Sequence, residues 1–198
     1  KSLLVNFQRN FTAAYRQLKS ELVSGDYGVM QKVVVHYSKG IIHNGSHAMD
    51  LLLEWFGPPD GMHVLSAQID YKETDPTVDA LLMFNEVPVY FMGFNENCFS
   101  LFEIHLYTET AILSLTESGQ TLRTKTVQEK STVSNHKKLG PVAETNMGLD
   151  MAMLDALNSL VDGIKDRASL FDGKRALAGL KVTHQLAKLG MKRIARES

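Results

Sequence analysis

The ionisable residues best placed for chemistry lie in one short segment, Tyr37–Gly57, with the sequence YSKGIIHNGSHAMDLLLEWFG. If this segment is helical, His47, Asp50 and Glu54 fall at i, i+3 and i+7 and share one face. Histidine suits acid–base chemistry because its unperturbed pKa lies near neutrality. A second face is apolar and would bury the helix; it carries Ala48, Leu51, Leu52, Trp55 and Phe56. The segment therefore predicts a rigidly held site.

The same segment raises the question of a metal. His43 and His47 have the i, i+4 spacing at which two helical histidines chelate zinc, and Asp50 offers a third ligand. However, Asn44 or Ser46 is a typical helix cap, which would leave His43 outside the helix. No glutamate follows His43 as in the HExxH zinc motif. We therefore expect no metal site here.

Charge and composition narrow the classes of function. Lys and Arg number 21 against 22 Asp and Glu, so the net charge of -1 gives no electrostatic case for nucleic acid or an anionic membrane. No apolar run reaches the length of a membrane span. The single cysteine, Cys98, cannot form an internal disulfide and favours a reducing, cytoplasmic location. The length of 198 residues suits one domain, and the start at Lys1 suggests a piece of a longer protein.

The elements around the His47 segment indicate an α+β fold. Helical spacing predicts a helix over Phe11–Val23, and alternation predicts a strand over Val29–Tyr37. Six more short strands follow, at residues 64–71, 78–84, 89–94, 99–107, 111–115 and 121–127. Because short links join antiparallel neighbours, we expect a large antiparallel sheet built from meanders.

The strand Phe99–Tyr107 indicates that the two faces of this sheet differ. Every second residue is apolar and would pack under helices. The residues between them include Glu103, His105 and Tyr107, on a face that could carry a ligand or another subunit. His36 belongs to no motif, and we interpret it as structural or exposed.

The last third of the chain predicts a loop followed by two helices. Residues 131–146 are polar and without periodicity. Apolar spacing predicts helices over residues 149–164 and 173–189. The apolar positions expected in the second helix include Leu177, Leu180, Ala187 and Leu189.

Four segments carry a resemblance to a known family. Val5–Phe11 (VNFQRNF) looks like a strand leading into a helix, and Gly25–Val29 (GDYGV) looks like a glycine turn before a strand. Gly40–Gly57 has a histidine followed three residues later by an aspartate, and Phe102–Leu115 looks like paired strands. In this order, the chain resembles the C-terminal domain of the Gfo/Idh/MocA oxidoreductases, the family of glucose–fructose oxidoreductase and inositol dehydrogenase.

The resemblance implies a large open antiparallel sheet with helices packed on one face, like the C-terminal domain of glyceraldehyde-3-phosphate dehydrogenase. It also implies an N-terminal Rossmann domain that binds NAD or NADP. The sequence has neither a strand–GxGxxG–helix nor the Glu-Lys-Pro that carries the family's lysine, so we assign it no cofactor-binding residue. Residues 1–198 are then a single substrate-binding and dimerisation domain of a longer oxidoreductase, inactive alone.

The resemblance also implies roles for residues of the first segment. His47 matches the family's histidine, which acts as acid or base near the reacting hydroxyl; the alternative is a histidine that only caps or packs at a helix start. His43 stands where the family commonly has an aspartate, so it binds substrate, serves a different proton relay, or marks a loss of catalysis. Asp50 matches the aspartate after the histidine and would support the helix by local pairing.

Further substrate-binding candidates come from two strand ends. Asn6 and Arg9 match the family's first strand, and Arg9 could reach a hydroxyl, carboxylate or phosphate, although an ordinary surface arginine is the alternative. Asn10 replaces the usual second arginine. Tyr37 and Lys39 end the strand before the His47 segment and could line the same pocket, with a solvated strand end as the alternative.

Two hypotheses of function follow. The first is the substrate-binding half of an NAD(P)-dependent oxidoreductase acting on the hydroxyl of a sugar, polyol or sugar nucleotide. The second is a non-catalytic ligand-binding or dimerisation module derived from that fold. In both, the open sheet face would pair two subunits into a homodimer or higher oligomer.

Overall fold

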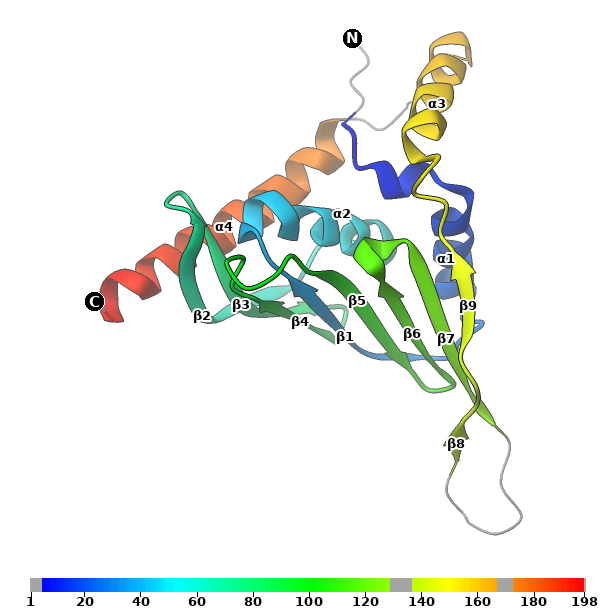
Figure 1. Cartoon of the computed structure of the whole chain (residues 1–198), viewed down its shortest axis with the longest axis horizontal. Coiled ribbons are helices and arrows are strands. Elements are labelled where there is room, and N and C mark those ends of the chain that lie inside the picture. Colours follow the sequence, from blue (N-terminus) through cyan, green and yellow to red (C-terminus); the bar gives the residue numbers. More distant parts are fainter. Residues whose placement is uncertain (1–4, 129–136, 167–172, 198) are drawn as a thin grey trace.

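The computed structural model describes residues 5–128, 137–166 and 173–197 as one sheet with helices (Figure 1). The strands are β1 (Met30–Tyr37), β2 (Gly61–Lys72), β3 (Asp75–Phe84), β4 (Val87–Gly93), β5 (Phe102–Thr108), β6 (Ala111–Thr116), β7 (Thr121–Gln128), β8 (Lys138–Leu139) and β9 (Ala143–Asn146). The helical elements are η1 (Gln8–Phe11), α1 (Ala13–Ser24), η2 (Gly40–Asn44), α2 (Gly45–Phe56), η3 (Glu117–Gly119), α3 (Ala152–Asp166) and α4 (Gly173–Glu197). The six strands expected after the His47 segment are all present.

The strand order is β2-β3-β4-β1-β5-β6-β7-β8, with β9 also paired to β7. Every pair is antiparallel except β1 with β4, which is parallel. The expectation of simple meanders is wrong here, because the chain between β4 and β5 crosses the end of β1 instead of forming a hairpin. Backbone hydrogen bonds from Phe94 N to Tyr37 O and from Ser38 N to Leu101 O hold this crossing. β1 therefore lies in the middle of the sheet.

The core lies on one face of the sheet, under α1, α2 and α4 (Figure 1). In β5 the side chains alternate between buried and half-buried along the whole strand. The buried residues of the central strands include Val33, Val35, Val78, Ala80, Leu82, Val89, Phe91, Ile104 and Leu106. The predicted fold class, an open and mostly antiparallel sheet with helices on one face, is confirmed. Among the described residues, no helix has the length and apolar character needed to cross a membrane.

The face that α4 buries agrees with the prediction at Ala187 and Leu189 but differs from it earlier in the helix. Leu177 and Leu180 are 49% and 43% exposed, whereas Leu186 is fully buried. Small residues let α4 approach the sheet closely: a Cβ on Gly190 would lie 2.9 Å from Val78 Cγ2. Hydrophobicity alone misses such a face, because glycine contributes close backbone approach rather than apolar area. The helix also continues to Glu197, beyond the expected end.

The loop expected at residues 131–146 contains two short strands, and its residues 131–136 lie outside the described part. β9 pairs with β7, with Glu144 opposite Arg123. All four residues of β9 are exposed, so no alternation of apolar and polar residues marks it as a strand.

Candidate active site around His47

The turn from β1 into α2 is built on two left-handed residues and a buried carboxylate. Lys39 and Gly40 have φ values of 67° and 74°. The chain then forms the π-helical turn η2, whose backbone N–H groups at Ile42 and His43 donate to Asp75 at 2.8 and 2.9 Å. Asp75 belongs to β3 and is 6% exposed. A residue distant in sequence therefore caps this helical segment.

The caps predicted from the sequence are wrong. Asn44 has helical backbone angles and makes no cap; its side-chain amide donates to Leu101 O at 3.1 Å. Ser46 Oγ donates backwards to His43 O at 2.9 Å. Because η2 runs directly into α2, His43 lies inside the helical segment rather than before it.

Gly40→Ala is expected to destabilise the protein by about 3 kcal/mol in chemical unfolding. An alanine would carry the left-handed strain, and its Cβ would also overlap the Asp75 carboxylate. Gly25→Ala is the matched control, because Gly25 has φ 79° with nothing within 4 Å of a Cβ. It should cost only about 1 kcal/mol. Equal losses for the two variants would show that Asp75 does not constrain this turn.

His47 lies near the start of α2, where its ring meets Phe7 edge-on at 5.6 Å between centroids and 82° between planes. Burial lowers the pKa of His47 to about 4, and the nearby charges of Arg9 and His43 add to the effect. Among the described residues we find no hydrogen bond to this imidazole. His47 is therefore neutral at physiological pH, the state in which it can accept a proton.

Arg9 lies in η1, and its surroundings exclude the ordinary surface arginine considered from the sequence. It is 8% exposed, with its guanidinium 4.1 Å from the ring centroid of Phe102. Its Nη2 donates to Ser118 O at 2.7 Å. Burial lowers the pKa of this guanidinium. Residues Val5–Phe7 before it are not in a strand, contrary to expectation.

Tyr37 does not line a pocket. It is fully buried, and its hydroxyl donates to Val78 O at 2.7 Å and accepts from Val78 N at 2.8 Å. The prediction that Tyr37 contacts substrate is wrong, because both its ring and its hydroxyl are used within the fold.

The other substrate-binding candidates make contacts in different places. His43 is exposed, and its ring lies 5.3 Å from that of Tyr71. Lys39 Nζ forms an ion pair with Glu96 at 3.3 Å. Asn6 is exposed, with its amide 3.8 Å from Met153 Sδ. The structure thus brings Arg9 and His43 within electrostatic range of His47, while Asn6 and Lys39 contact residues elsewhere.

Asp50 is the centre of a buried polar network. It is 2% exposed and accepts hydrogen bonds from Asn10 and, at 3.3 Å, from Arg175 Nε. Arg175 also forms an ion pair with Glu54, so one guanidinium bridges two carboxylates on the same face of α2. Burial raises the pKa of Asp50 to about 6, against the opposing effects of Arg175 and Asn10. No feature of the sequence predicts that Arg175 lies beside this helix.

Comparison with known proteins supports the fold directly. No family model and no curated protein matches the chain. Among solved structures, levoglucosan dehydrogenase in complex with NADH and levoglucosan has a TM-score of 0.72 at 10% identity. The chain shares the fold of this dehydrogenase, which is the fold that the resemblance to the C-terminal domain of the Gfo/Idh/MocA oxidoreductases predicts. A dehydrogenase (MviM) from Clostridium difficile has a TM-score of 0.65 at 11% identity, and a super-repressor mutant of Gal80p from Saccharomyces cerevisiae 0.71 at 12%.

These similarities extend over nearly all of this chain but not over all of its neighbours. They cover 100%, 94% and 100% of this chain in the order given. The chain spans 65%, 62% and 64% of the length of those structures. The predicted resemblance is confirmed as a likeness of fold.

The lowered pKa of His47 predicts that the stability of the protein depends on pH. Its pKa is about 4 in the folded state and near 6.5 when unfolded, so the unfolded chain binds more protons between these values. The free energy of unfolding should therefore fall as the pH drops through this window, by on the order of 2 kcal/mol from His47 alone. His47→Gln should remove this part of the fall, measured as the difference between the unfolding curves of the two proteins. An unchanged pH dependence would contradict a partly buried, neutral imidazole.

Proposed function

We propose that this chain is the substrate-binding C-terminal half of an NAD(P)-dependent oxidoreductase acting on the hydroxyl of a sugar, polyol or sugar nucleotide. Residues 1–198 would form one substrate-binding and dimerisation domain. The observation that carries the proposal is the partly buried His47, which packs against Phe7 near the start of α2 and whose pKa is lowered there. Structures of levoglucosan dehydrogenase with the same fold are complexes with NADH and levoglucosan or L-sorbose, which supports a sugar-like substrate.

In this reaction His47 takes the proton of the substrate hydroxyl. Oxidation of the carbon that bears this hydroxyl would also need a hydride acceptor, which is the chemistry that NAD or NADP supplies. The positive charge of Arg9 disfavours a lasting imidazolium, so the proton must pass onward after each turnover. His43, exposed beside Tyr71, is our candidate for contact with the substrate. Asp50 has a structural role, because its carboxylate accepts hydrogen bonds from Asn10 and Arg175.

The described residues do not fit a dinucleotide at the start of α2. A strand followed by a turn and a helix start resembles a phosphate site in outline, since free backbone N–H groups there bind anions. Here the N–H groups of Ile42 and His43 already donate to the Asp75 carboxylate. We therefore assign NAD or NADP to a dinucleotide-binding part outside these residues.

A second candidate function is a non-catalytic ligand-binding or dimerisation module. The environment of His47 favours it: among the described residues no carboxylate is bonded to the imidazole, and the neighbouring Asp50 is bound to Arg175 instead. A structural neighbour, Gal80p, is named as a repressor mutant rather than as an enzyme. In this function the uncovered sheet face would pair two copies of the chain.

Binding of NAD(P)H and turnover separate the two functions. The full-length protein should bind NADH or NADPH, detected as enhanced nicotinamide fluorescence, and should reduce NAD(P)⁺ with members of a panel of sugars, polyols and sugar nucleotides. The 198-residue chain alone should do neither. A full-length protein that binds no NAD(P)H would favour the non-catalytic module. Light scattering that shows only a monomer would refute pairing through the sheet face.

A further inference from the structure

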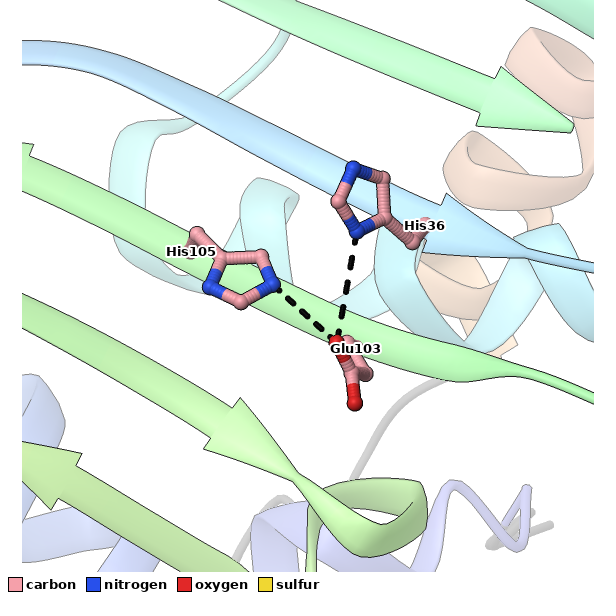
Figure 2. Close-up of side chains that lie close together, drawn as sticks. All are labelled: His36, Glu103 and His105. Atoms are coloured by element: carbon pink, nitrogen blue, oxygen red, sulfur yellow. Dashed lines mark hydrogen bonds and ion pairs between the residues drawn. The ribbon is translucent and has the colours of Figure 1, made fainter.

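Three side chains with metal-binding atoms converge on the sheet face opposite the helices (Figure 2). They are His36 from β1 and Glu103 and His105 from β5. Glu103 Oε2 lies 3.2 Å from His105 Nε2 and 4.0 Å from His36 Nδ1. One nitrogen or oxygen from each residue lies within 4.8 Å of the other two.

The register of the sheet creates this convergence. His36 is directly opposite Glu103, and Val34 is opposite His105. Because side chains of a strand alternate between faces, Glu103 and His105 lie on the same face, and His105 is diagonal to His36. β1 and β5 are each hydrogen-bonded to neighbours on both sides, so the backbone that carries the three residues is fixed.

Neighbouring side chains orient both imidazoles. His105 Nδ1 is 3.0 Å from Ser114 Oγ on β6, which leaves Nε2 directed toward Glu103. A hydrogen-bonded partner on the second ring nitrogen is typical of histidines that bind metals, because it fixes the tautomer and the orientation of the ring. The ring of His36 packs edge-on against Phe94 at 5.5 Å.

We propose that His36, Glu103 and His105 form a binding site for a divalent transition-metal ion, with zinc as the best match. Two imidazoles and one carboxylate are the protein ligands of a common open zinc site, whose fourth position takes water or another molecule. Tetrahedral zinc with bonds of about 2.0–2.1 Å places its donor atoms about 3.3 Å apart. The separation of 3.2 Å meets this value, whereas the separation of 4.0 Å and that between the two imidazoles, which is within 4.8 Å, must shorten by side-chain rotation when an ion binds.

Accessibility agrees with such a site. The side chains of His36 and Glu103 are each 27% exposed, and that of His105 is 17% exposed. In a single copy of the chain the three are thus held by the sheet, yet an ion can enter from solvent and keep an open coordination position. The helical pair considered from the sequence is arranged differently, since His43 packs on Tyr71 and His47 packs on Phe7.

The test is zinc binding by the 198-residue chain after removal of metals with a chelator. Calorimetric titration with zinc chloride should give one ion per chain, and cobalt(II) should produce the visible absorption of a tetrahedral complex. Magnesium should give no response, because it prefers an all-oxygen environment. His36→Ala or His105→Ala should weaken zinc binding by more than about 100-fold, and Ser114→Ala by about 10-fold.

Two controls separate this site from surface histidines and from the site around His47. His184→Ala, at an exposed position of α4, should leave zinc binding unchanged. Zinc binding that survives His36→Ala and His105→Ala but is lost in His43→Ala would overturn the proposal in favour of the helical pair. So would the absence of any zinc binding, which would leave a hydrogen-bonded polar cluster. Glu103→Gln, which keeps the shape of the side chain, guards against losses caused by misfolding: it should retain the metal-free unfolding midpoint and still bind zinc more weakly.

Discussion

If the proposed oxidoreductase function is correct, His47→Gln is expected to lower kcat of the full-length protein by about 10²–10⁴-fold, the usual contribution of a positioned general base. Glutamine keeps a polar side chain of similar length but cannot accept the proton of the substrate hydroxyl. The measurement is the steady-state rate of NAD(P)H formation at saturating substrate. KM should change less than kcat, because the lost interaction develops as the proton moves.

The dependence of rate on pH distinguishes proton transfer from packing. In the unaltered protein, kcat/KM should fall as the pH drops below the His47 pKa of about 4, because protonated imidazole cannot act as a base. His47→Gln should lose this acidic limb. His184→Ala, far from the site in sequence and exposed on α4, should match the unaltered protein. Full turnover by His47→Gln would remove His47 from the mechanism and favour the non-catalytic module.

The parts of the fold that the sequence predicts well are those set by local chemistry. The alternation along β5 can be predicted from adjacent residues. Phe102, Ile104 and Leu106 are buried, and Glu103 and His105 lie on the other face. The end of α2 is equally local, since Gly57 adopts φ 80° and its N–H bonds to Leu53 O. A strand period of two and a glycine at a helix end need no knowledge of distant residues.

The errors arise where a distant residue decides the outcome. Asn44 and Ser46 are residue types that often cap helices, but the backbone N–H groups at this helix start donate to Asp75 from β3 instead. Tyr37 resembles a pocket residue at a strand end, yet its hydroxyl completes the backbone hydrogen bonding of Val78. Neither partner can be inferred from sequence spacing, because each depends on which strands become neighbours.

In the candidate site, too, local spacing predicts some features and distant residues decide others. The shared face of Asp50 and Glu54 follows from helical spacing, and one guanidinium does bridge both carboxylates. The identity of that guanidinium does not follow, because Arg175 comes from the first turn of α4. In the segment where the family resemblance leads us to expect a second arginine, Asn10 instead donates to Asp50. The positive charge beside this carboxylate thus comes from the far end of the chain.

Arg175→Met is therefore expected to destabilise the protein by about 3–5 kcal/mol, because it leaves a buried carboxylate without its counter-charge. Burial already raises the pKa of Asp50 to about 6, and Arg175 opposes that rise. Without Arg175 the pKa rises further, and the folded state binds more protons than the unfolded chain above about pH 4. The destabilisation relative to the unaltered protein should then grow as the pH rises from about 6 to about 7.5, measured by urea unfolding at each pH.

Removing the carboxylate charge should restore stability. Asp50→Asn combined with Arg175→Met should be more stable at neutral pH than Arg175→Met alone, because no unpaired charge stays buried. Arg123→Met is the matched control, since this arginine also bonds two carboxylates, Glu117 and Glu144, but on the exposed surface. It should change stability little, because solvent screens exposed ion pairs. If Arg123→Met destabilised the protein as much as Arg175→Met, the burial of Asp50 would not explain the loss of stability.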